Sequence, residues 1–177
     1  HLMSHHLVAG ETPEPESMHL NGGRAYDLYE TADGRWLSVG SLEPKFWQGF
    51  CAAIDRPDLI APGLSLDSAE QARVKAATRA AILTRPLAEW IAVFAPLDVC
   101  VEPVLTVPEA LTQPHVAARG LVVDVPKPAG GTQRQIASPW RFSGGAAEYQ
   151  YAGTALGSHT AEILREAGFT ETEIENY

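Results

Sequence analysis

Basic residues and long apolar runs are both scarce in this sequence of 177 residues. The 13 Lys and Arg are outnumbered by 22 Asp and Glu, which gives a formal net charge of -9. That charge argues against nucleic acid or an anionic membrane as the main partner, because both require basic patches. No apolar run approaches the roughly 18 residues of a membrane span, and no secretory signal is recognisable. We therefore expect a cytoplasmic protein.

Cysteine is also scarce, and motifs that make a site by themselves are missing. Cys51 and Cys100 lie in apolar segments without CxxC spacing, so both are predicted to be buried thiols in a reducing compartment. His1 and His5 stand four residues apart without a third ligand nearby, so no metal site is expected. The sequence contains neither a P-loop nor a GxSxG elbow. The residues alone indicate no self-contained active site.

What is present is the pattern of a packed α+β domain. Hydrophobic residues make up 45% of the chain, and their spacing predicts a β-hairpin and a short sheet packed by helices. Strands are expected at 25–31, 35–41, 98–105 and 121–125, and helices at 43–54, 67–85, 86–95 and, broken, at 107–120. The Asp33-Gly34 pair predicts the hairpin turn. Capping boxes are predicted at Ser68/Gln71 and Thr170/Glu173.

Residues 1–10 have the spacing of the last turns of an apolar helix that ends at Gly10. A tag remnant and a piece of a longer protein are both compatible with this start. We favour the longer protein, because a tag seldom merges smoothly into helical spacing.

The segment from His19 to Tyr29, HLNGGRAYDLY, places a glycine bend directly before a strand. From the residues alone, Asn21-Gly22-Gly23 is either a plain bend or the rim of a site. Asp27 and Glu30 fall on opposite faces of the strand and are interpreted as solvent-exposed carboxylates.

Four segments in the same order resemble the class III CoA-transferases (CaiB/BaiF), the family that includes α-methylacyl-CoA racemase. These segments are residues 20–51, 98–125, 134–143 and 156–177. The resemblance implies a longer enzyme with a large Rossmann-like domain, mostly preceding these residues, that binds most of the coenzyme A and supplies a catalytic aspartate or histidine. It also implies an interlocked homodimer. Residues 1–10 would end a helix of the large domain and 11–20 would be a linker. Residues 21–143 would form the small domain, and 144–177 would return to the large one.

The resemblance gives the glycine bend a function. Its racemase branch has aspartate before the Gly-Gly pair, whereas this chain has Asn21. An amide cannot act as one of the two bases of a racemase, so we expect acyl-CoA transfer, with a racemase or epimerase as the alternative. A non-catalytic assembly module is a third hypothesis.

The resemblance also names the site residues. It implies catalytic positions at Asn21 and Glu109, the latter resembling a glutamate that orients the racemase histidine. Substrate-binding positions are implied at Gly22, Gly23 and Tyr26. The expected substrate is a coenzyme A thioester, and no permanently bound cofactor is expected.

Overall fold

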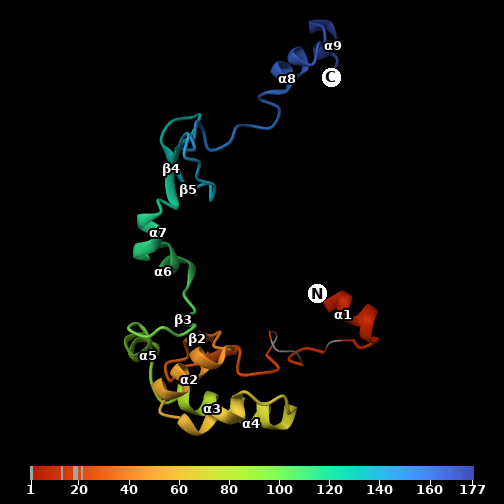
Figure 1. Cartoon of the computed structure of the whole chain (residues 1–177). Helices are drawn as coiled ribbons and strands as arrows, with labels where there is room; N and C mark the ends of the chain where they lie inside the picture. Colours follow the sequence, from red (N-terminus) through yellow and green to blue (C-terminus); the bar gives the residue numbers. More distant parts are fainter. Residues whose placement is uncertain (1, 13, 18–19, 21) are drawn as a thin grey trace. The chain divides into compact units, whose positions relative to one another are not determined.

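The computed structural model describes residues 2–12, 14–17, 20 and 22–177. The chain divides into two compact units, residues 1–104 and residues 105–177, coloured red to green and green to blue in Figure 1. Each unit has its own antiparallel sheet. The expected small domain, 21–143, runs across this boundary.

The sheet of the first unit has the strand order β1-β2-β3. Its strands are β1 (Asp27–Glu30), β2 (Trp36–Val39) and β3 (Val101–Pro103). Leu28 pairs with Ser38, and Val39 pairs with Val101. The predicted hairpin turn is confirmed: Gly34 has φ +72, and the Asp33 carboxylate accepts a hydrogen bond from the Thr31 hydroxyl at 2.5 Å.

Helices make up most of the rest of the first unit. They are α1 (Leu2–Ala9), α2 (Pro44–Ala53), the 3-10 helix η1 (Pro57–Leu59), α3 (Ile60–Gly63), α4 (Ser68–Ile82) and α5 (Leu87–Phe94). Pro44 occupies the first turn of α2, as the sequence predicts, because a proline there gives up an N–H that has no partner in the helix. The predictions of helices at 43–54, 67–85 and 86–95 are confirmed to within a few residues.

An aromatic stack forms the core of this unit. The ring centroids of Trp47 and Phe50 are 5.4 Å apart, those of Phe50 and Phe94 are 5.8 Å apart, and those of Phe94 and Trp90 are 5.7 Å apart. The Trp90 indole donates a hydrogen bond to the Ile82 carbonyl at 2.8 Å. Each of these rings is at most 5% exposed, so the stack holds α2, α4 and α5 together.

Two sequence predictions in this unit are wrong in detail. Cys51 is buried, but Cys100 is exposed. The N-cap of α4 is Asp67, whose carboxylate accepts from the Glu70 N–H at 2.7 Å, and Ser68 is the first helical residue. Aspartate is as good an N-cap as serine, and Gln71 is engaged elsewhere.

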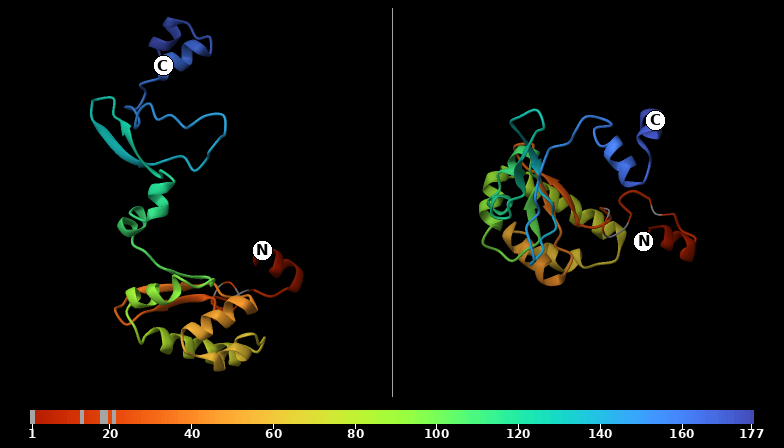
Figure 2. Two further views of the ribbon diagram at one scale, coloured as in Figure 1. Left: turned by 60° about the vertical axis from the view of Figure 1, so that its left-hand side comes forward. Right: turned by 90° about the horizontal axis from the view of Figure 1, so that it is seen from above.

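The second unit combines short helices with a hairpin. Its elements are α6 (Val107–Leu111), α7 (Pro114–Ala118), β4 (Val122–Pro126), β5 (Thr132–Ile136), α8 (Thr160–Glu166) and α9 (Glu171–Glu175). Figure 2 shows the β4–β5 hairpin and the long loop that follows it. The broken helix at 107–120 and the Thr170/Glu173 capping box are confirmed. Helices and short antiparallel sheets in both units confirm the α+β class.

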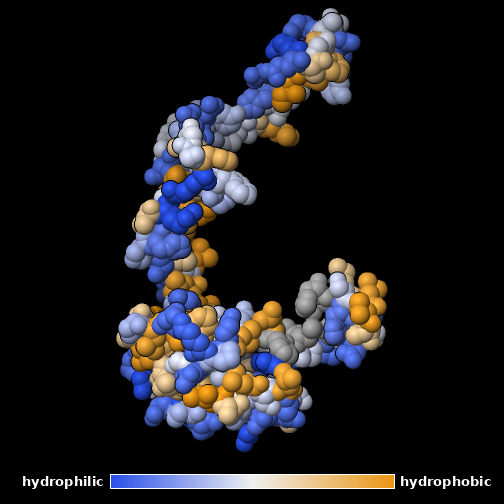
Figure 3. All heavy atoms as spheres, in the orientation of Figure 1, coloured by the Kyte–Doolittle hydropathy of each residue, from blue (hydrophilic) through white to orange (hydrophobic). Residues whose placement is uncertain are grey.

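Apolar side chains are common on the surface of the second unit (Figure 3). Large exposed ones are Ile136, Trp140, Phe142, Leu156, Ile163 and Phe169. Within the described part of the chain, none of the helices combines the length and the apolarity that crossing a membrane requires.

Candidate functional site

The glycine bend of the first unit lines a pocket of about 300 Å³. We call this cavity the glycine-bend pocket. It is lined by Glu16, Ser17, Gly22, Gly23, Ser68, Gln71, Ala72 and Lys75. One wall is therefore the start of α4, and the other is the chain segment that leads into β1.

Gly22 has a conformation and a setting that favour glycine. It is buried and has φ +95, a region that a residue with a Cβ adopts only with strain. A Cβ at this position would lie 3.1 Å from Cγ of Glu16 and 3.3 Å from Nζ of Lys75. Backbone conformation and crowding both act against a larger residue, so the bend in this form depends on Gly22.

Lys75 reaches from α4 to the bend. Its ammonium donates to the Gly22 carbonyl at 2.7 Å, to the Asp27 carboxylate at 2.7 Å and to the Glu16 carboxylate at 3.0 Å. Its side chain is 11% exposed. Burial lowers the pKa of this ammonium, but the hydrogen bonds to Asp27 and Glu16 outweigh burial and hold the pKa above its ordinary value. Lys75 is therefore charged at neutral pH.

Two residues of this cluster were misjudged or missed from the sequence. Asp27 is not a solvent-exposed carboxylate, because its side chain is only 24% exposed and is paired with Lys75. Lys75 itself shares the buried face of α4 with Gln71, Val74, Thr78 and Ile82. A lysine on the buried face of a helix requires a charged or polar partner, and that spacing is the signal that could have found it.

The other end of the bend is held by Tyr29 of β1. Its hydroxyl donates to the Ala25 carbonyl at 2.9 Å, and the side chain is fully buried. Burial first, and the Asp27 charge second, raise the pKa of Tyr29 well above its ordinary value, so the phenol stays protonated and donates. The carbonyl groups of Gly22 and Ala25 are thus both fixed.

The backbone N–H group of Arg24 lies between these two carbonyls in the sequence. Among the residues that the structure describes, none accepts a hydrogen bond from it. Backbone N–H groups at a bend can bind an oxyanion. The bend therefore offers hydrogen-bond donors and no proton-transferring group of its own.

Gln71 adds an acceptor to the same pocket. Its amide NH₂ is directed at the carbonyls of Pro62, Gly63 and Ser65, at 3.3, 3.1 and 2.8 Å. This arrangement fixes the orientation of the amide, and no described residue donates a hydrogen bond to its buried Oε1. The same contacts explain why Gln71 does not complete the predicted capping box with Ser68.

The remaining predicted site residues lie in different places. Asn21 is outside the described residues. Tyr26 is 37% exposed, and its ring packs against Gly40, where a Cβ would lie 3.5 Å from the ring. Glu109 belongs to the second unit, where its carboxylate accepts from the N–H and the hydroxyl of Thr106 at 2.8 and 2.7 Å and so caps α6.

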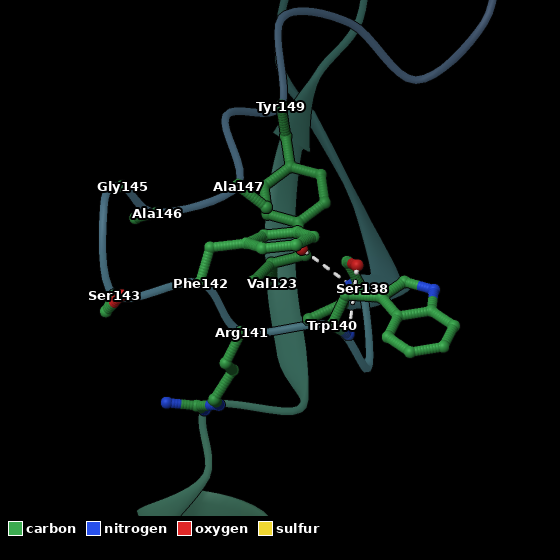
Figure 4. A pocket seen from close by; sticks show the side chains of 12 residues that line it. Val123, Ser138, Trp140, Arg141, Phe142, Ser143, Gly145, Ala146, Ala147 and Tyr149 are labelled. Atoms are coloured by element: carbon green, nitrogen blue, oxygen red, sulfur yellow. Dashed lines mark hydrogen bonds between the residues drawn. The ribbon is translucent and has the colours of Figure 1, made fainter.

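The second unit has a larger pocket of about 520 Å³ beside the hairpin. Figure 4 shows Trp140, Phe142 and Tyr149 around it, with Arg141 directed away from the rings. The Tyr149 hydroxyl accepts from the Ser138 N–H at 2.6 Å. The residues that line this pocket include no carboxylate, histidine or cysteine, so the pocket lacks a side chain of the kind that usually serves as a general base.

A family model described as "CoA-transferase family III" matches residues 1–160. The chain belongs to this family. Human alpha-methylacyl-CoA racemase is 32% identical over 175 residues, which covers 95% of this chain and 43% of the human protein. The mouse racemase is 33% identical and covers 88% of this chain and 40% of the mouse protein. Formyl-CoA:oxalate CoA-transferase of Escherichia coli O157:H7 is 30% identical and covers 76% of this chain and 33% of that protein.

Solved structures show the same fold. A CAIB/BAIF family protein from Brucella suis has a TM-score of 0.64 at 18% identity, and the match covers 93% of this chain and 43% of the other. Rv3272 from Mycobacterium tuberculosis has a TM-score of 0.63 at 20% identity, covering 90% of this chain and 50% of the other. The chain thus spans less than half the length of these curated CoA-transferase family III relatives.

Proposed function

We propose that this chain is the small-domain part of an enzyme that transfers coenzyme A from an acyl-CoA thioester to a carboxylate. Membership of CoA-transferase family III supports chemistry on acyl-CoA. The observation that carries the choice of transfer is the composition of the glycine bend: an amide, Asn21, followed by two glycines. It supplies hydrogen bonds where a racemase requires a base.

The carboxylates beside the bend support the same choice. Glu16 and Asp27 both accept from the Lys75 ammonium. Both carboxylates are thus engaged in ion pairs with the same ammonium. The described part of the glycine-bend pocket is therefore suited to stabilising charge rather than to moving the α-proton.

In the proposed reaction a carboxylate from the large domain attacks the thioester carbonyl. The carbon–sulfur bond breaks, coenzyme A leaves as a thiolate, and a mixed anhydride remains. The thiolate then attacks the enzyme's carbonyl carbon of the anhydride, which releases the donor acid and leaves an enzyme–CoA thioester. The acceptor carboxylate repeats these steps in reverse. The backbone N–H groups of the Gly22–Gly23 bend and the following Arg24 donate to the oxyanion in each addition, Asn21 adds a side-chain hydrogen bond, and Tyr26 contacts the substrate.

A racemase or epimerase is the second candidate. The human and mouse relatives named racemases match at 32% and 33% identity and cover more of this chain than the E. coli transferase does. In that reaction Glu109 would orient a histidine of the large domain.

The test uses a protein that joins this chain to its family large domain. Acyl-CoA and a second carboxylic acid are incubated in deuterated water, and mass spectrometry follows both coenzyme A transfer and deuterium at the α-carbon. Transfer without exchange is expected, and the chain alone is expected to be inactive. Exchange without transfer would identify a racemase. If neither transfer nor exchange is detected, the result would favour an assembly module.

Asn21→Asp separates the two enzymatic candidates further. For a transferase the added charge opposes the developing oxyanion, so transfer should slow by roughly tenfold to a thousandfold, the range spanned by one oxyanion donor. For a racemase the new carboxylate should raise α-proton exchange. Asn176→Asp, which makes the same chemical change at the C-terminal helix, is the matched control and should leave both rates unchanged.

A further inference from the structure

We propose that Lys75 is a positioning residue that fixes the Gly22–Gly23 bend in the shape in which its N–H groups meet the acyl-CoA thioester. This inference rests on the proposed function. It concerns a residue in the middle of α4, the site's other wall, that acts on the substrate only through the bend.

Three acceptors from three chain segments meet at the Lys75 ammonium. They are the carbonyl of Gly22, the carboxylate of Asp27 at the start of β1, and the carboxylate of Glu16 in the turn before the bend. A lysine ammonium has three donors, so these contacts use all of them. Lys75 therefore has no donor left for a substrate, and its effect on one must pass through the bend.

The bond to Gly22 is the one that makes this arrangement specific. A lysine that served only to balance charge could pair with Asp27 and Glu16 alone. Here the same ammonium holds the peptide oxygen between Gly22 and Gly23 at 2.7 Å, so it sets the plane of the peptide whose N–H belongs to Gly23. Tyr29 fixes the Ala25 carbonyl from the other side. These two fixed carbonyls determine the direction of the backbone N–H groups of Gly23 and Arg24 between them.

The backbone conformation of Glu16, in the turn before the bend, supports the same role for Lys75. Glu16 has φ 57, a left-handed conformation that is uncommon for a residue with a side chain. Such strain persists where surrounding contacts hold it. The carboxylate of Glu16 is 70% exposed and yet is bonded to Lys75, so the lysine also ties this turn to the bend.

The first measurement uses this chain by itself. Lys75→Met keeps the length of the side chain and removes all three hydrogen bonds. We expect the ¹⁵N NMR order parameters of Gly23 and Arg24 to fall from about 0.85 to below about 0.6, the change from a rigid to a flexible backbone. Leu37 and Val39 in the sheet should keep their values. Lys45→Met is the matched control, because Lys45 forms an exposed ion pair with Asp98 in the same unit.

The second measurement uses the protein joined to its large domain. Lys75→Met should lower kcat at least about tenfold while KM for acyl-CoA stays within about threefold, since the bend acts on the oxyanion and not on coenzyme A binding. Lys75→Arg, which keeps the charge, should restore part of kcat. If Lys75→Met does not fold, Glu16→Gln at the exposed partner of Lys75 should lower kcat and the order parameters of Gly23 and Arg24 by smaller amounts.

Each result decides a separate question. Unchanged order parameters at Gly23 and Arg24 would overturn the inference, and so would increased mobility with an unchanged kcat. A wild-type protein that folds and binds acyl-CoA but catalyses neither transfer nor exchange would overturn the proposed function. In that case the order parameters would still decide whether Lys75 holds the bend, and its catalytic assignment would fall.

Discussion

Replacing Gly22 with alanine tests the structure of the glycine bend without changing its charge. The substitution places a Cβ on a residue with φ +95, at 3.1 Å from Cγ of Glu16 and 3.3 Å from Nζ of Lys75. Gly34→Ala is the matched control, because Gly34 also has a positive φ, +72, but its Cβ would meet only the Glu30 carboxylate at 3.9 Å. The difference between the two variants therefore reports the crowding of Lys75.

The expected losses in the free energy of unfolding follow from the backbone conformation of each glycine and from the contacts that its new Cβ would disturb. A left-handed conformation costs a residue with a Cβ about 1–2 kcal/mol, and the reduced entropy of the unfolded chain returns about 0.4–1 kcal/mol. Gly34→Ala should therefore lower the free energy of unfolding by about 1 kcal/mol. If the added Cβ at Gly22 displaces Lys75, a charged hydrogen bond worth about 1.5–3 kcal/mol is lost as well. Gly22→Ala should then cost about 2–4 kcal/mol.

The assay is urea denaturation followed by tryptophan fluorescence, which reports the first unit through Trp47 and Trp90. The slope of the free energy against urea should be the same for all three proteins, so that midpoints compare directly. Equal losses in Gly22→Ala and Gly34→Ala would refute the reasoning, because the contacts around Lys75 would then contribute nothing to the bend.

Three further predictions concern the core, pH and association. Gly63→Ala should lower the free energy of unfolding by about 2–4 kcal/mol in the same assay, because its Cβ would lie 2.1 Å from Nε1 of buried Trp47. The control Gly144→Ala adds a Cβ in open space and should lower it by less than about 0.5 kcal/mol. The free energy of unfolding should fall as pH rises above 10. The unfolded chain releases the Tyr29 and Lys75 protons at their ordinary pKa values of 10.0 and 10.5, while the folded chain retains them. If the free energy of unfolding falls with pH as steeply in Lys75→Met as in the wild type, the role of Lys75 is contradicted. The apolar stripe Ile163, Leu164, Phe169 and Ile174, in which Ile163 is 60% and Phe169 41% exposed, should favour self-association, and a strictly monomeric sedimentation profile at high concentration would count against it.

Local signals made most of the fold predictable. Asp33-Gly34 determines a turn through its own backbone preferences, and Pro44 and the Thr170/Glu173 pair mark helix starts by chemistry within one turn. Each of these interactions joins residues close in sequence. The pattern of the chain is therefore enough to locate them.

The candidate site depends on contacts that no local pattern contains. Lys75 meets Asp27 and Gly22 from a helix distant in the sequence. Alternation places Asp27 on the same strand face as Tyr29 but does not identify its charged partner. Gln71 has capping-box spacing, but three distant carbonyls take its amide. The exposure of Cys100 likewise depends on which faces of the fold remain uncovered. The glycine bend was recognised from the sequence, and the residues that hold it were not.

The central claim is that the Gly22–Gly23 bend meets the acyl-CoA thioester, and amide hydrogen exchange tests it most directly. In the protein joined to its large domain, acyl-CoA should slow exchange at Gly23 and Arg24 at least about tenfold, because the thioester then covers the bend and its oxygen accepts from these N–H groups. Coenzyme A without an acyl group should protect them much less, and α5 should respond to neither ligand. If acyl-CoA binds and the exchange of Gly23 and Arg24 stays as it is in the free protein, the bend does not face the thioester and the account is wrong.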